Sequence, residues 1–149
     1  MKRSILLVLM MLPIMTMAQL PQFDKAADKY DGKEGVTAMT INKQMIAMFA
    51  GGIDGIDMVD EVQILLSEDT NIAKSIIKDA KKAAKKSKVN EFISANNNGA
   101  TFSVYTKSEN DTITNIVVIV ENDTPSGFIV ISGNIPEDKI KDIVKLANL

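Results

Sequence analysis

The most uneven chemistry in the sequence lies in two adjacent blocks of charge. The first block, residues 54–69, contains acids and no Lys or Arg. Its acids are Asp54, Asp57, Asp60, Glu61, Glu68 and Asp69. The second block surrounds the single acid Asp79 with lysines, namely Lys74, Lys78, Lys81, Lys82, Lys85, Lys86 and Lys88. A lysine ridge of this kind can bind anionic lipid headgroups, acidic glycans or an acidic protein surface, with an affinity that salt weakens. The basic block is therefore the candidate anion- or partner-binding surface.

The same lysines also have a structural interpretation. A helix that begins at Asp69 or Thr70 has acids at its positive end and lysines toward its negative end, which is the distribution that the helix dipole favours. Lysines four residues apart, such as Lys74 and Lys78, repel each other weakly. The ridge contains no arginine and no interleaved aromatic residue, which argues against nucleic-acid binding. A solvated helix face is the favoured interpretation, and an anion-binding face is the alternative.

The acidic block could offer oxygen ligands to calcium. Its spacing argues against that interpretation, because Asp54, Asp57 and Asp60 recur at every third position with apolar residues between them. An EF-hand loop instead places its ligands at alternate positions. Ordinary solvation of a loop is the favoured interpretation, so we expect no bound metal.

The residue types that are missing exclude much of enzyme chemistry. The 149 residues include no His and no Cys, so the chain cannot form a Ser-His-Asp triad, a thiol nucleophile or a zinc site of the usual kind. The glycines of residues 51–55 do not have the spacing of a dinucleotide-binding loop, and no phosphate-binding Gly-Lys-Ser/Thr occurs. We therefore expect a non-enzymatic protein without a cofactor.

The first residues have the pattern of a secretory signal peptide. Lys2 and Arg3 precede an apolar run over residues 5–15, and small residues at 16 and 18 suit a cleavage site after Ala18. The run is shorter than the roughly 20 apolar residues that a membrane-spanning helix needs. We expect residues 1–18 to be removed on export to the periplasm or the exterior, which leaves no integral membrane span.

The remaining residues, 19–149, predict a single α+β domain. Apolar periodicity predicts a helix that includes Phe23 and Tyr30, a strand at 36–41, a helix capped by Asn42, and a strand at 61–67. The long lysine-rich helix, a second helical piece with Phe92 and Ile93, three strands at 101–107, 113–121 and 127–133, and a helix from Pro136 follow. We expect a two- or three-layer sandwich, in which helices pack on a mixed sheet of about five strands that ends in an antiparallel meander.

Two apolar features need a packing partner. Residues 116–120 and 128–131 are apolar on both sides of their strands, and helices on both faces are favoured over a partner or homodimer surface. Met45, Met48 and Phe49 lie along one side of the helix after Asn42. Core packing is the favoured interpretation of these three, and an adaptable binding stripe is the alternative.

Several segments together resemble a known family. They are Lys-Glu-Gly-Val-Thr-Ala-Met-Thr-Ile from Lys33, the Asn-Lys-Gln-Met start of the following helix, Val62–Leu65, and Phe-Ile-Val-Ile-Ser-Gly-Asn-Ile from Phe128. This pattern is similar to a domain-of-unknown-function family in secreted and lipoprotein-like proteins of Bacteroidetes. The shared residues are apolar strands and turn glycines, so the resemblance implies no catalytic residue. It implies an envelope-signalling context, because its members are encoded beside sigma and anti-sigma regulators.

A possible modification site lies in the turn at 110–113. Asn110-Asp111-Thr112-Ile113 resembles the Asp-Ser/Thr-apolar sequence that is O-glycosylated in exported proteins of that phylum, with Thr112 as the acceptor.

These observations favour a non-enzymatic envelope module that docks on another protein, or on its own copy, through its strand-rich half or its lysine-rich helix. The alternative is a binder of anionic lipid or glycan through Lys74–Lys88. An enzyme that uses only carboxylates, Lys, Ser or Thr is a third hypothesis, and it requires a deep pocket lined by two or more such groups.

Overall fold

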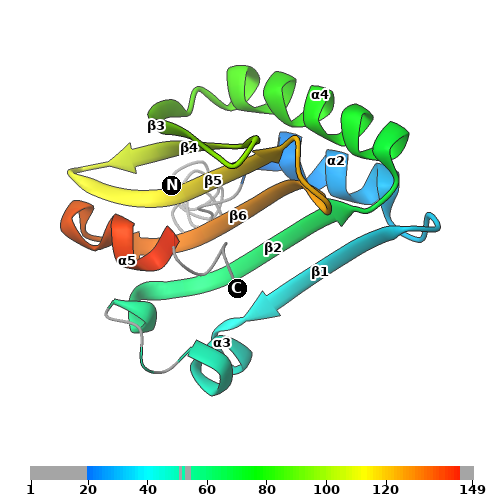
Figure 1. Cartoon of the computed structure of the whole chain (residues 1–149). Helices are drawn as coiled ribbons and strands as arrows, with labels where there is room; N and C mark the ends of the chain where they lie inside the picture. The colour runs from blue at the N-terminus through cyan, green and yellow to red at the C-terminus, as the bar shows by residue number, and fades with distance from the viewer. Residues whose placement is uncertain (1–19, 51, 53–54, 145–149) are drawn as a thin grey trace, which may run out of the picture.

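A computed structural model describes residues 20–50, 52 and 55–144 of the chain, so the predicted signal peptide lies outside the described residues. The centre of the fold is a six-stranded sheet with the order β1-β2-β6-β5-β4-β3, in which every neighbouring pair is antiparallel (Figure 1). The strands are β1 (Val36–Asn42), β2 (Val59–Ser67), β3 (Asn90–Asn97), β4 (Ala100–Glu109), β5 (Thr112–Glu121) and β6 (Ser126–Ile135).

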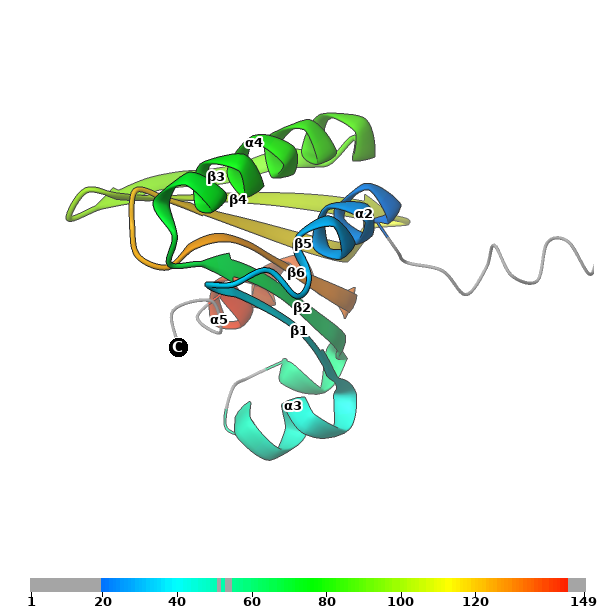
Figure 2. The ribbon, with the colours of Figure 1, turned by 90° about the vertical axis from the view of Figure 1, so that its right-hand side faces the viewer.

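The helices precede, interrupt and follow this sheet. They are α2 (Pro21–Tyr30), α3 (Lys43–Ala50), α4 (Thr70–Ser87) and α5 (Ile140–Val144), with short 3-10 helices η1 (Ile56–Met58) and η2 (Glu137–Lys139). Figure 2 shows α2 and α4 on one side of the sheet, α5 on the other side, and α3 at the end of β1. The α+β class is confirmed, and the sandwich layering stays a prediction.

The predicted mixed sheet of about five strands is wrong in both number and direction. The chain returns from α3 to a strand antiparallel to β1, and β6 inserts between β2 and β5, so no parallel pair forms among the described strands. The additional strand is β3, which contains Phe92 and Ile93 and replaces the predicted helical piece. Asn98 and Gly99, with φ of 54° and 89°, form the two-residue turn that pairs β3 with β4.

The predicted meander is confirmed by β4, β5 and β6. Ile116–Val120 is buried along its whole length, which places β5 inside the sheet. Gly127 has a φ of 153°, and a Cβ at this position would collide with the backbone oxygen of Leu65 in β2. The sequence run that is apolar on both sides therefore marks the interior of the sheet.

Helices α2 and α4 bury one face of the sheet. Phe23 of α2 meets Phe128 of β6 edge to face, with ring centroids 5.2 Å apart. The buried stripe of α4 consists of small and medium side chains, Ala73, Ile76, Ala80, Ala83 and Ala84. Asp69 caps this helix by accepting hydrogen bonds from the backbone nitrogens of Asn71 and Ile72, at 2.9 and 3.1 Å. The predicted start of the long helix is thus confirmed.

Short elements cover the opposite face. Ile46 of α3, Ile56 of η1, and Ile140 and Ile143 at the C-terminal end pack in one cluster with side chains of β2, β4, β5 and β6. The predicted helix from Pro136 begins as η2 and continues as α5, and its predicted apolar position Ala147 lies outside the described residues. The described helices therefore contribute to both faces, but unequally.

Candidate functional site

The seven lysines of the basic block form an exposed surface on α4 and its C-terminal cap, which we name the lysine surface. Lys74, Lys78, Lys81 and Lys85 recur at i, i+4, i+7 and i+11, so they follow one line along the helix. Lys82 and Lys86 lie to one side of this line, and Lys88 follows the helix in a left-handed conformation with a φ of 57°. The structure thus brings most of the predicted lysines onto one side of the molecule.

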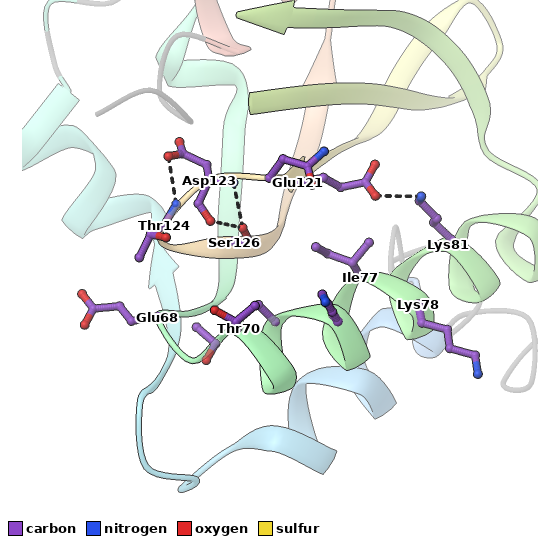
Figure 3. A pocket seen from close by; sticks show the side chains of 13 residues that line it. Glu68, Thr70, Ile77, Lys78, Lys81, Glu121, Asp123, Thr124 and Ser126 are labelled. Carbon is purple, nitrogen blue, oxygen red and sulfur yellow. Dashed lines mark hydrogen bonds and ion pairs between the residues drawn. The ribbon is translucent and has the colours of Figure 1, made fainter. Parts of the chain in front are cut away.

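A hollow of about 390 Å³ separates α4 from the turn between β5 and β6 (Figure 3). Lys74, Lys78 and Lys81 line one wall, while Glu121 and Asp123 belong to the opposite wall. The Lys81 ammonium and the Glu121 carboxylate lie 2.8 Å apart and form an ion pair across the hollow. Because the two walls carry opposite charges, this hollow does not favour a simple anion.

The two serine hydroxyl groups in this hollow donate to backbone carbonyl oxygens. Ser67 Oγ donates to the carbonyl oxygen of Gly35 at 3.0 Å, and Ser126 Oγ donates to the carbonyl oxygen of Asp123. A nucleophilic serine needs a neighbouring base to accept its proton, and a backbone carbonyl cannot take that role. Ser67 and Ser126 are therefore not arranged as activated nucleophiles.

A second hollow, of about 200 Å³, lies between α2 and α4. Four lysines line it, Lys25 and Lys29 from α2 and Lys82 and Lys86 from α4. Sequence reasoning missed Lys25 and Lys29. Their i, i+4 spacing places them on one side of the first predicted helix, but only the packing of α2 beside α4 shows that this side faces the basic block.

Asp79 is the acid at the centre of this second hollow. Its Oδ2 accepts hydrogen bonds from Tyr30 Oη at 2.6 Å and from Lys29 Nζ at 3.0 Å. Burial raises the pKa of Asp79, but the hydrogen bonds from Tyr30 and Lys29 and the charges of Lys29 and Lys82 together hold it below its usual value. The Asp79 hydrogen bond in turn raises the pKa of Lys29. Asp79 therefore ties α2 to α4 and offsets part of the lysine charge.

The acidic block is divided by the fold. Asp57, Asp60 and Glu61 lie around the start of β2, Glu68 and Asp69 follow its far end, and Asp54 lies outside the described residues. Asp69 serves as the N-terminal cap of α4, and Oδ1 of Asp60 lies 3.6 Å from Nζ of Lys43. Within the described ranges, no group of three or more acidic side chains could hold a metal ion.

The predicted core packing of Met45, Met48 and Phe49 is wrong. Their side chains are 39%, 79% and 78% exposed. Met39 on β1 and Met58 on η1, two elements that contact α3, are 46% and 39% exposed. We name these five residues the methionine surface.

The position of α3 explains this outcome. The helix lies at the end of the sheet and packs on β1, β2 and η1, and of its described side chains Ile46 alone belongs to the core cluster. Ile46 is buried, whereas Met48 and Phe49 are mostly exposed. A signal for this surface was available in the sequence, because all four methionines after residue 18 lie within residues 39–58.

Thr112 is the first residue of β5 and is half-buried. The turn before it consists of Asn110 and Asp111, which have φ of 53° and 64°. The candidate acceptor thus lies at the edge of the predicted turn, and its glycosylation stays a prediction.

No helix within the described residues is long and apolar enough to span a membrane. Among curated proteins nothing matches the chain, and no solved structure matches it. The family model of a domain of unknown function, DUF4252, matches residues 30–143, a range that runs from the last residue of α2 into α5 and holds every strand of the sheet. The chain therefore belongs to the DUF4252 family of domains of unknown function.

Proposed function

We propose that this protein is a non-enzymatic module that acts after export and docks on another protein through the methionine surface. The observation that carries the proposal is that all four methionines after residue 18, Met39, Met45, Met48 and Met58, are among the exposed large apolar side chains. Buried Ile, Val, Leu, Phe and Ala fill both core clusters instead. Methionine is thus absent from the described core and lies on β1, α3 and η1, which contact one another or β2.

This surface has the properties of an adaptable binding site. Methionine side chains are unbranched and polarisable, so they can repack around partners of different shape. Phe49 adds a large rigid side chain, of the type that supplies much of the binding energy when it is desolvated at an interface. Lys43, in α3, and Asp60, two residues after Met58, supply polar groups at the margin of the methionine surface. We infer that the partner offers an apolar segment, such as one face of an amphipathic helix.

Site-specific photo-cross-linking in living cells tests the proposal. A photoreactive side chain replaces Met48 in one version of the full chain and Phe92 in another, because Phe92 is exposed at the opposite edge of the sheet. We expect a discrete cross-linked product with another envelope protein from position 48 and none from position 92. In a third version the photoreactive side chain replaces Met45, and Met48 and Phe49 are both changed to Ser. This version should no longer form the cross-linked product.

The control is the pair Phe92→Ser and Ile93→Ser, which removes exposed apolar side chains from β3 instead. These substitutions should leave the cross-linked product intact. Equal cross-linking from positions 48 and 92, or a product that survives the loss of Met48 and Phe49, would contradict docking through the methionine surface.

Binding of anionic lipid or glycan through the lysine surface is the second candidate function. The observation that favours it is the hollow between α2 and α4, where Lys25 and Lys29 add to the lysines of α4 around one acid. Retention on phosphatidylglycerol vesicles at low salt, lost at high salt and after Lys82, Lys85 and Lys86 are changed to Glu, would support it. Equal retention by these variants would contradict it.

A further inference from the structure

The two edge strands of the sheet differ in how well they are protected against pairing. Edge strands expose unpaired backbone groups, and proteins usually blunt them with charges, proline or bulges. β3 has an irregularity in its pairing between Glu91 and Ile93, and it carries the charge of Glu91. β1 contains no charge, proline or glycine, and its pairing with β2 runs without interruption from Val36 to Asn42. Thr37–Thr40 is exposed, and among the described strands none pairs with the outer side of β1.

We propose that β1 pairs antiparallel with β1 of a second copy of this chain, about a two-fold axis at Met39. In this register Met39 lies opposite its own copy, Ala38 lies opposite Thr40, and Thr37 lies opposite Ile41. Each pair keeps both side chains on the same face of the sheet, as an antiparallel ladder requires. The two sheets then form one continuous sheet of twice the width.

Two features of the strand favour its own copy as the occupant. A symmetric interface needs a patch that complements itself, and β1 brings no like charges into opposition because it has none. At its ends, the same register brings Glu34 near Lys43 of the second copy, once at each end of the pair. Lys43 is well exposed, and its partner Asp60 lies 3.6 Å away, which is too far for a strong hydrogen bond. Glu34 of one copy and Lys43 of the other therefore carry opposite charges at each end of the pair.

The absence of cysteine from the chain makes this register directly testable. Opposite residues in an antiparallel pair have Cα atoms about 4.5 to 5.5 Å apart, which is within the range that a disulfide spans. The full chain with Met39→Cys, exposed to a mild oxidant in whole cells, should form a disulfide-linked dimer. Thr37→Cys is the matched control, because its two copies lie about 14 Å apart in this register and should not be linked.

A mixture of two differently tagged chains tests the pairing further. Thr37→Cys in one chain and Ile41→Cys in the other should link to each other, although neither forms a linked dimer alone. The absence of a Met39→Cys dimer, or equal dimer from Met39→Cys and Thr37→Cys, would overturn the proposal. The Met39→Cys dimer should persist when Met48 and Phe49 are changed to Ser, so the failure of self-pairing and the failure of docking through α3 are distinguishable.

Discussion

The two faces of the sheet are covered in different ways. On one face, α2 and α4 lie close to the strands, and Phe23, Phe128 and Ile76 are fully buried there. On the other face, the covering elements are short, and α3 leaves Met48 and Phe49 in solvent (Figure 2). The alanines of α4 let the helix approach the sheet closely, whereas Met48 and Phe49 of α3 remain mostly exposed. The first face is therefore structural, and the second has apolar surface that remains available for a partner.

The strongest test of this contrast compares one phenylalanine from each side. Phe128→Ala removes a fully buried ring that contacts Phe23, and we expect it to lower the free energy of unfolding by about 3 to 5 kcal/mol. Phe49→Ala removes a ring that is mostly exposed, so a change within about 0.5 kcal/mol is expected. Urea unfolding of both variants measures the difference. Similar losses in the free energy of unfolding for the two variants would show that Phe49 is packed as tightly as Phe128.

The contact between α2 and α4 predicts a smaller effect with a defined pH dependence. The pKa of Asp79 is lower in the folded chain than its usual value of 3.8, so the ionised carboxylate stabilises the fold above that pH. This stabilisation should disappear as the pH falls through the folded pKa, below 3.8.

Asp79→Asn should cost about 1 kcal/mol at pH 7, because it weakens the hydrogen bonds from Tyr30 and Lys29. Thermal unfolding from pH 7 to pH 3 measures both effects. The difference between the variant and the original chain should narrow toward the acidic end of the series. A constant difference across the whole pH range would contradict the role given to the ionised carboxylate.

The smallest expected effect concerns the lysine surface and has the opposite sign. Lys78 lies four residues from both Lys74 and Lys82 on α4, so Lys78→Glu replaces repulsion with attraction. We expect the free energy of unfolding to rise by a few tenths of a kcal/mol. Thermal unfolding at low and high salt measures it, and the gain should shrink in high salt. A loss of stability would mean that Lys78 makes a favourable contact in the fold.

Much of the fold could be predicted because local patterns and tertiary packing agree. The buried stripe of α4, the Asp69 cap and the apolar run of β5 all follow from residue spacing. β3 was missed because its short segment is apolar only at Phe92 and Ile93, and a pattern of this length does not distinguish a strand from a helix. The turn at Asn98 and Gly99 was the better signal, since this pair favours the positive φ values of a tight hairpin.

The candidate surfaces were predicted less completely than the fold. The lysine surface follows from helical spacing, but Lys25 and Lys29 join it only through the packing of α2 on α4. Met45, Met48 and Phe49 were assigned to the core because helical spacing identifies an apolar side of a helix without showing whether anything lies against it. Whether another element covers the apolar side of α3 depends on the position of α3 at the end of the sheet. This position in turn depends on the pairing of distant strands.

Methionine oxidation tests the central claim most directly, because all four methionines after residue 18 belong to the methionine surface. The rate of sulfoxide formation at Met48 would be measured by mass spectrometry in the purified protein and in intact cells, relative to free methionine in each. We predict rapid oxidation in the purified protein and severalfold slower oxidation in cells, where a partner covers the surface. Equal relative rates in both settings would contradict docking through the methionine surface.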